Sequence, residues 1–262
     1  MKGNNNIVAC GVRVATYNVH KCRGFDGRVA PERVVSVIKE LNADILCLQE
    51  VVNAPGKPLI PGSPRIYDQA GEIARALPGY RSAFGANRPL HGGVYGNMTL
   101  TRLPLKSWRN YDLTRPERSR EERGVLQTEI EIADGQTLQV FNVHLGTGPV
   151  ERRYQGEKLL SREILTHPKL TGSRLVLGDF NEWTRGLTTR LLKNEFQSFR
   201  PHHVLRFPRT YPGMLPFLSL DHFYFEAPLE LEGARLFRTR RALVASDHLP
   251  LIADFRIRDL VA

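Results

Sequence analysis

The chain has 262 residues, and its 41% apolar share is enough to build a sizeable core. Thirty-seven lysines and arginines against 27 acidic residues give a net charge of +10, which favours polyanionic partners but also fits a solvated basic surface. Three cysteines fit no disulfide framework, no run approaches the ~20 apolar residues of a membrane span, and no secretory signal is recognisable, so we expect a cytoplasmic protein.

Short apolar runs with strand-like composition recur along the chain. They are rich in Val, Ile, Leu, Phe and Tyr, and several alternate with a period of two, which is typical of β-strands. The predicted strands cover residues 12–19, 44–51, 98–101, 125–132, 137–145, 174–177, 220–225 and 251–257. Asp134 and Gly135 stand between two of these runs and predict a hairpin, because tight turns need a positive φ.

Helical patterns are fewer and lie between the strand groups. Pro31 suits a first helical position, and apolar residues then recur at helical spacing as far as Leu41. Further helices are predicted at 68–77, 151–165 and 187–192, and loops at 53–64, 115–123 and 207–218. The pattern predicts two packed sheets with helices on the outside, in one domain spanning residues 1–262 with a core at about 12–257.

Polar side chains close or interrupt these apolar runs. Burying such groups without partners costs roughly 2–7 kcal/mol each on transfer scales. Their convergence on one site is therefore the economical explanation, and it concerns Asn18, Glu50, His144, Asp179, Asn181, Asp221, Asp247 and His248.

The residue types at these positions indicate one kind of chemistry. Carboxylate and amide oxygens are the ligands that Mg²⁺ and Mn²⁺ prefer. Two histidines can share acid and base work on either side of a phosphorus atom. The chain carries no HExxH, GxSxG or GxxxxGK[ST] motif, so neither a zinc peptidase, a serine hydrolase nor a P-loop enzyme is indicated.

Six short motifs follow one another in a recognisable order. They are Thr16–His20 (TYNVH), Leu48–Val51 (LQEV), Asn142–Leu145 (NVHL), Gly178–Asn181 (GDFN), Leu220–Asp221 and Ser246–His248 (SDH). From about Val12 to Phe255 the chain resembles the endonuclease/exonuclease/phosphatase superfamily, which includes deoxyribonucleases, abasic-site endonucleases, bacterial sphingomyelinases and inositol-polyphosphate phosphatases. The resemblance implies an α+β, four-layer sandwich of two mainly antiparallel sheets flanked by helices, and it is greatest to small bacterial members.

The resemblance also implies metal-binding roles. Glu50 is expected to be the principal Mg²⁺ ligand, with Mn²⁺ as a possible substitute. Asn18 would help to orient the metal or a phosphate oxygen, and Asp247 would contact the metal side of the site. Asn97 and Arg123 are expected to contact substrate, and Arg102 is a weaker candidate for binding phosphate.

Catalytic roles follow for the remaining residues. Asp179 would orient or deprotonate the attacking water, and Asn181 would donate to a phosphate oxygen. The Asp-Phe-Asn spacing places both side chains on one face of a strand, with an Asx turn as the alternative. His248 would act as general base or phosphate donor, with Asp221 holding its ring. His144 would be the acid for the leaving oxygen.

The substrate remains open between two classes. The net charge and the arginine-rich 115–123 segment favour a nuclease that cleaves phosphodiesters, and His144 argues against abasic-site repair. The 207–218 segment suits a phosphodiesterase at an anionic lipid surface through Tyr211, Met214, Leu215 and Phe217, although these residues could equally cap the core. A non-catalytic scaffold is the third and least favoured hypothesis.

Overall fold

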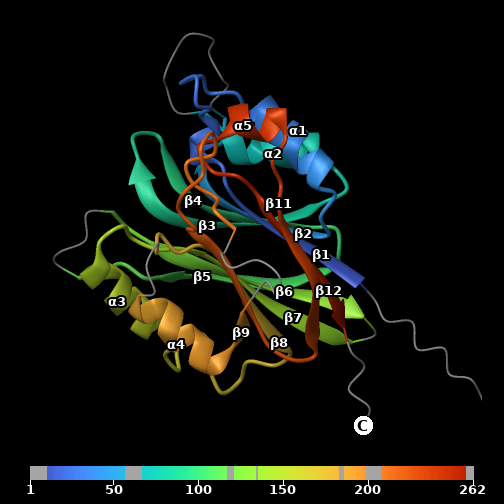
Figure 1. The fold of residues 1–262 in the computed structure, drawn as a ribbon, viewed down its shortest axis with the longest axis vertical. Coiled ribbons are helices and arrows are strands. Elements are labelled where there is room, and N and C mark those ends of the chain that lie inside the picture. Colours follow the sequence, from blue (N-terminus) through green and yellow to red (C-terminus); the bar gives the residue numbers. More distant parts are fainter. Residues whose placement is uncertain are drawn as a thin grey trace, which may run out of the picture.

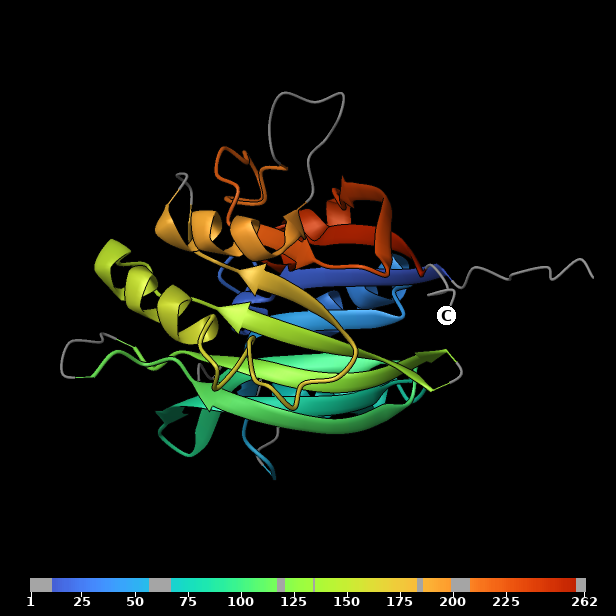
Figure 2. The ribbon, with the colours of Figure 1, turned by 90° about the horizontal axis from the view of Figure 1, so that it is seen from below.

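Two six-stranded sheets face one another in the part of the chain that the computed structural model describes, which is residues 11–56, 67–116, 121–133, 135–182, 186–198 and 208–257 (Figure 2). The first sheet has the order β11 (Leu229–Leu236), β12 (Leu251–Ile257), β1 (Gly11–Asn18), β2 (Ile45–Asn53), β4 (Gly93–Thr101) and β3 (Arg81–Leu90). The second has the order β5 (Leu105–Asp112), β6 (Gly124–Ala133), β7 (Gln136–His144), β8 (Ser173–Asp179), β10 (Asp221–Phe225) and β9 (Gln197–Ser198).

Helices cover the outer face of each sheet (Figure 1). On the first sheet lie α1 (Pro31–Leu41), α2 (Gln69–Ala76) and the short α5 (Arg240–Ala245), and on the second lie α3 (Pro149–Leu159) and α4 (Leu187–Glu195). A single 3-10 turn, η1 (His20–Cys22), follows β1. The layers therefore run helix, sheet, sheet, helix, which confirms the predicted four-layer α+β sandwich.

Each sheet is built around one parallel pair of strands. The parallel pairs are β1 with β2 and β7 with β8, and the other paired strands in the described residues run antiparallel. The expectation of mainly antiparallel sheets is thus confirmed. Because parallel strands point the same way, their carboxyl ends emerge together at one edge of each sheet.

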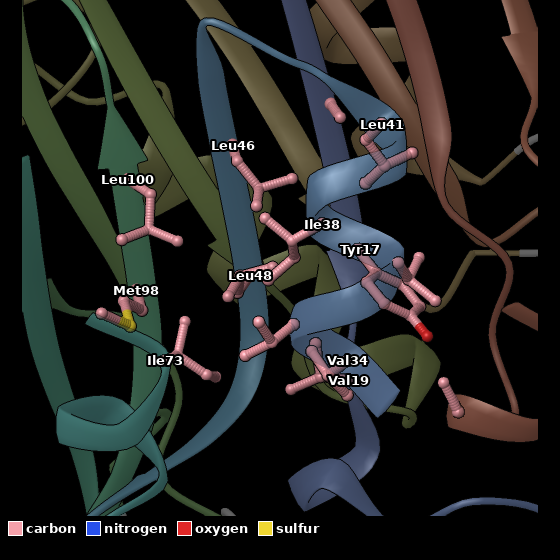
Figure 3. Packing of buried hydrophobic residues seen from close by; sticks show 14 of the residues in the cluster. Tyr17, Val19, Val34, Ile38, Leu41, Leu46, Leu48, Ile73, Met98 and Leu100 are labelled. Atoms are coloured by element: carbon pink, nitrogen blue, oxygen red, sulfur yellow. The ribbon is translucent and has the colours of Figure 1, made fainter. Parts of the chain in front are cut away.

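The core fills both the gap between the sheets and the gap under the helices. The buried face of α1, with Val34, Ile38 and Leu41, packs on Tyr17 and Leu48 of the first sheet (Figure 3). Between the sheets lies a separate apolar cluster drawn from β1, β2, β6, β7, β8, β10, β11 and β12. Burial of this kind, at ~25 cal/mol per Å² of apolar surface, holds the strand ends in fixed positions.

Several sequence predictions need correction. The helix predicted at 151–165 ends at Leu159, and hydrogen-bonded turns follow it, such as Ile164 N to Ser161 O. The patterns missed β3, β5, β9, β11 and α5, and the predicted 98–101 strand is only the second half of β4. The β6–β7 hairpin is confirmed by the pairing of Ala133 with Gln136, while Asp134 lies outside the described residues, as do 57–64, 117–120 and 207 of the predicted loops.

Candidate active site

Four of the predicted site residues stand at or near the carboxyl ends of the two parallel strand pairs. Asn18 ends β1 and Glu50 lies near the end of β2, whereas His144 ends β7 and Asp179 ends β8. His144 and Asp179 are direct neighbours in the β7–β8 register. Asn18 Nδ2 donates to Asp179 Oδ2 over 2.9 Å, which joins the two sheets at this edge.

Two more site residues reach the same edge from strands that run the other way. Asp221 begins β10 and pairs with Asp179 in the antiparallel β8–β10 register, and His248 lies just before β12. Antiparallel strands bring their amino ends to the edge where their partners end. The topology therefore gathers residues that are more than 200 positions apart in the sequence.

Glu50 is turned into the site by an irregularity in β2. Its φ is 61°, and the β2–β4 register shifts between Leu48 and Val51, as at a β-bulge. Glu50 Oε1 accepts from Asn18 Nδ2 at 3.3 Å, and Oε2 accepts from Lys21 Nζ at 3.1 Å. Burial alone would raise the pKa of Glu50, but His144, when protonated, and Lys21 lower it to about 2, so the carboxylate is ionised at neutral pH.

A buried polar bridge fixes the strand of Glu50 against the strand of His144. Gln49 Nε2 donates to Asn142 Oδ1 over 2.8 Å, from β2 to β7. Asn142 Nδ2 in turn donates to the carbonyl oxygens of Leu48 and Met98, both at 3.1 Å. These hydrogen bonds cross between the sheets directly behind the site, so they hold the two sides of the site in register.

Asp179 occupies the centre of the arrangement. Its Oδ2 lies 3.8 Å from His144 Nε2 and 3.7 Å from His248 Nε2. Burial raises the pKa of Asp179 above the usual value, with His248 acting in the opposite direction. The preceding Gly178 has a φ of 141° and lies so near Val143 that a Cβ would stand 2.0 Å from its carbonyl oxygen, so this approach requires glycine.

Asn181 reaches the site differently from the favoured prediction. The strand ends at Asp179, Asn181 has a φ of 48°, and Asp179 Oδ1 accepts from the Asn181 backbone N at 2.8 Å. The prediction that Asp179 and Asn181 lie on one face of a strand was therefore wrong, and the alternative, an Asx turn, is correct. Asn181 Nδ2 donates to Leu145 O over 2.9 Å, which leaves its second N–H for a ligand.

His248 is enclosed by carboxylates. Asp221 Oδ2 lies 3.1 Å from its Nδ1, as predicted, and Asp179 faces its Nε2. Burial alone would lower the pKa of His248, but the charges of Asp221 and Asp179 raise it to about 10. His248 is therefore an imidazolium at neutral pH.

His144 has the opposite environment. Arg123 Nη1 lies 3.2 Å from its Nδ1, and Arg123 Nη2 also forms a 2.8 Å ion pair with Glu121. Burial and then the Arg123 charge lower the pKa of His144 well below its usual value, with Glu50 opposing them. His144 is therefore neutral at pH 7, and Lys21 is the cation that remains beside Glu50.

The other predicted residues lie at different depths. Asp247 is at the mouth, where its Oδ1 lies 3.5 Å from His20 Nδ1. Asn97 is wholly buried, and its Nδ2 donates to Gly124 O and Asn142 O, so it ties β4 to the second sheet below the site. Direct substrate contact by Asn97 stays a prediction. Arg102 follows β4, donates to Asn42 Oδ1 and lies beside Asp44, which precedes β2, so it is at the end of the first sheet opposite the site.

The comparisons with known proteins agree with this arrangement. The model of the Endonuclease/Exonuclease/phosphatase family matches residues 15–248. The chain belongs to this family. It is therefore a hydrolase that acts on phosphoester bonds.

Individual relatives match this chain over nearly its whole length. An uncharacterized protein of Escherichia coli K12, YbhP, is 30% identical over 251 residues, which are 94% of this chain and 96% of YbhP. An endonuclease/exonuclease/phosphatase from Beutenbergia cavernae has a TM-score of 0.75 at 21% identity, covering 95% of this chain and 72% of that one. The human Nocturnin catalytic domain with bound sulfate has a TM-score of 0.68 at 21% identity, covering 94% and 93%. These structures show the shared fold.

Three side chains at the site were given no role in it by the sequence. Lys21 lies directly after the TYNVH motif, and its Nζ is 5.3 Å from the centre of the Tyr95 ring. The Tyr211 ring, expected to face a lipid surface or to cap the core, lies 4.9 Å from the His248 ring, and His20, the last residue of the TYNVH motif, faces Asp247. Adjacency to a motif could have indicated Lys21, whereas Tyr211 reaches the site only through folding of its loop.

The donor set at the mouth fits a hard divalent cation. Mg²⁺ usually takes one or two carboxylates and fills its other positions with water and substrate oxygens. Glu50 supplies an ionised carboxylate that already holds a cation, the Lys21 ammonium. The described residues contain no ready-made group of three or more His, Cys, Asp or Glu metal ligands.

No helix in the described part of the chain is long and apolar enough to cross a bilayer.

Proposed function

We propose that the protein is a Mg²⁺-dependent phosphodiesterase, with Mn²⁺ as a substitute, that hydrolyses its substrate by in-line attack of water. The observation that carries this proposal is the position of Asp179, within 4 Å of both His144 Nε2 and His248 Nε2 and hydrogen-bonded to the Asn18 that also contacts Glu50. One phosphate group can touch all of these side chains at once. Bound at Glu50, Mg²⁺ would polarise a phosphate oxygen and offset its developing charge.

The residues on the Asp179 side prepare the attack. Asp179 accepts a proton from the attacking water, since its raised pKa brings it closer to working pH than an ordinary carboxylate. His248, being protonated, donates from Nε2 to a phosphate oxygen, so of the two roles predicted for it the phosphate donor is the better supported. The second N–H of Asn181 donates to the same phosphate group.

The residues on the opposite side serve the leaving group. His144 offers an N–H to the departing oxygen. In the free protein it is held neutral by burial and by Arg123, and a bound phosphate would balance the Arg123 charge and so raise the His144 pKa toward the range where it can give up a proton. We assign the second phosphate contact to Arg123, and this assignment is supported by its Nε, which is buried without a hydrogen-bond partner.

Two substrate classes have support. A nuclease is supported by the net charge of +10. The described part of the 115–123 segment adds little positive charge for binding nucleic acid, because Arg123 pairs with Glu121. A phosphodiesterase at a lipid surface is supported by the exposed Met214, Leu215 and Phe217 beside the site.

The proposal is tested by hydrolysis of a soluble aryl phosphodiester with added Mg²⁺. Glu50→Gln and His248→Ala should each reduce turnover by roughly 10²–10⁴-fold while the far-UV circular dichroism stays unchanged. Glu163→Gln, at an exposed position, and His167→Ala, at a half-buried one before β8, change the same residue types outside the site and should leave the rate as it is. Wild-type rates in either site variant would remove the assignment. Parallel incubation with plasmid DNA, RNA and anionic vesicles then separates the substrate classes.

A further inference from the structure

Exposed apolar side chains are concentrated beside the active site. Of the seven large hydrophobic residues that are exposed in the described part of the chain, five lie in two loops and one helix next to the site. Leu215 is 76% exposed, Phe25 60% and Phe217 58%. Single exposed apolar residues are ordinary, but a cluster of them marks an interaction surface. We call the set of Phe25, Met214, Leu215, Phe217 and Val244 the rim surface.

The first part of the rim surface belongs to a loop that is fixed to the catalytic segment. Tyr211, at the start of the loop, packs on His248, and Gly213 N donates to Asp247 O over 2.6 Å. The loop also closes on itself, because Leu218 N donates to Tyr211 O over 2.8 Å. Figure 2 shows it projecting beyond the sheets (orange, preceding β10). The apolar side chains are thus presented to solvent by a backbone with its own hydrogen bonds.

The second part joins the first through α5. Arg238, just before this helix, donates from Nη2 to Met214 O over 3.3 Å. At the other end of the helix, Val244 lies against the loop that follows η1, where a Cβ on Gly24 would stand 2.2 Å from Val244 O. Phe25 is the next residue. The two loops and α5 therefore form one continuous border beside the site, starting from Lys21 on one side and Tyr211 on the other.

The charges on this border are predominantly positive. Arg23, Arg28, Arg238 and Arg240 are exposed there. Two carboxylates of this region are paired with arginines, Asp26 with Arg33 and Arg28, and Glu40 with Arg241. Apolar side chains among arginines match the interface of an anionic bilayer, where the side chains enter the acyl boundary and the guanidinium groups bind lipid phosphates. Nucleic acid offers the phosphates but no counterpart for exposed aliphatic groups.

We propose that the rim surface docks the protein on anionic phospholipid bilayers, with the mouth of the site facing the headgroups. Docking would present phosphoesters at the bilayer surface to Asp179 and His248, and this consequence, unlike the docking itself, rests on the proposed function. Neither Leu215 nor Phe217 contacts the catalytic groups described above, so docking and hydrolysis can be measured separately.

The test is flotation with vesicles of phosphatidylcholine alone and of phosphatidylcholine mixed equally with phosphatidylserine. The wild type should bind the mixed vesicles, bind the neutral ones much less, and be released by high salt. The triple variant Met214→Ser/Leu215→Ser/Phe217→Ser should lose about 10-fold or more in affinity for the mixed vesicles. Phe25→Ser, on the other loop, should lose affinity by itself by a few-fold.

A matched control uses Trp108, an equally exposed apolar residue on β5. Trp108→Ser should bind the mixed vesicles like the wild type. The proposal is overturned if the wild type does not bind the mixed vesicles, or if the triple variant binds them as well as the wild type does. It is also overturned if the triple variant instead loses a wild-type dimer on size exclusion, or loses plasmid DNA binding by the same factor.

Hydrolysis of the soluble aryl phosphodiester separates this proposal from the proposed function. The triple variant should hydrolyse the soluble ester at the wild-type rate, because its substitutions lie outside the catalytic groups. Wild-type protein that binds mixed vesicles but fails to hydrolyse the soluble ester would contradict the proposed function and leave docking intact. Wild-type protein that hydrolyses the soluble ester but binds no vesicles would contradict docking and leave the proposed function intact.

Discussion

The two histidines of the site face each other across Asp179 in opposite electrostatic surroundings. His248 lies between Asp179 and Asp221, and its pKa is raised to about 10 against the effect of burial. His144 lies against Arg123, and its pKa is lowered by burial and by that guanidinium. Both rings are buried, so burial alone cannot explain the difference. The neighbouring charges decide which ring carries the proton.

This difference divides the site into two sides. The His248 side carries excess negative charge that holds a proton on the ring, so it suits donation to a phosphate oxygen. The His144 side carries Arg123, so its ring stays neutral until an anion arrives. The two histidines thus have different roles because their charged neighbours differ. Substituting those neighbours is the direct test of this difference.

The largest effect is expected at the group that both sides share. Asp179→Asn removes the carboxylate between the two rings and its ability to accept a proton, so turnover of the aryl phosphodiester should fall by about 10³-fold. The pKa of His248 should fall too, since one of its two facing carboxylates is gone. Steady-state kinetics gives the first result, and NMR titration of the imidazole gives the second. An unchanged His248 pKa would refute the two-sided description.

The next largest effect should come from Asp221→Asn, with a loss of about 10²-fold in kcat near neutral pH. In the wild type the pKa of His248 is raised above its unfolded value, so the stability from its charge is complete below about pH 6.5 and is lost as pH rises through about 10. In Asp221→Asn, this stability should be lost at a lower pH than in the wild type. The activity on the alkaline side of the pH profile should likewise fall at a lower pH. Rates and thermal melts from pH 6 to 10 measure both, and a profile with the wild-type alkaline limb would contradict the assignment.

The fold was predictable from the sequence except at its borders. All eight predicted strands exist, because each is an inner strand with another strand on both sides and so carries an apolar run. The missed strands β3, β5, β9 and β11 are the four sheet edges. Trp108 lies on β5, which is largely exposed, and edge strands of this kind are protected from further pairing by polar residues rather than marked by apolar ones. A method based on apolar runs therefore finds sheet centres and misses their edges.

The site was predictable to a similar degree, and for a related reason. Glu50, Asp179 and His248 interrupt apolar runs, so their cost of burial pointed to a shared purpose. The protonation states of the two histidines were not predictable from the sequence. Arg123 reaches His144 only because of the β6–β7 register, which no local sequence pattern predicts. Tyr211 was missed because its contact with His248 depends on how a proline-containing loop closes.

A smaller effect is expected on the His144 side. Arg123→Met removes the cation beside His144 while Arg88 still pairs with Glu121 at 2.7 Å, so the pKa of His144 should rise and the NMR titration should record it. Turnover should fall by about 10-fold, since a phosphate contact is lost. Arg153→Met, on the exposed face of α3, is the control and should change neither quantity.

The smallest effect concerns the cation that occupies the metal side. Lys21 Nζ lies 3.1 Å from Glu50 Oε2, so a divalent cation that binds Glu50 must displace the ammonium or share the carboxylate with it. Lys21→Met removes this competitor and should tighten Mn²⁺ binding by roughly three- to tenfold, because an attraction of about 1 kcal/mol no longer has to be broken. Isothermal calorimetry measures the change, with the exposed Lys39→Met as control. Weaker Mn²⁺ binding in Lys21→Met would show instead that Lys21 supports the metal site by orienting Glu50, and it would place Lys21 with the groups that build the site rather than with those that compete for it.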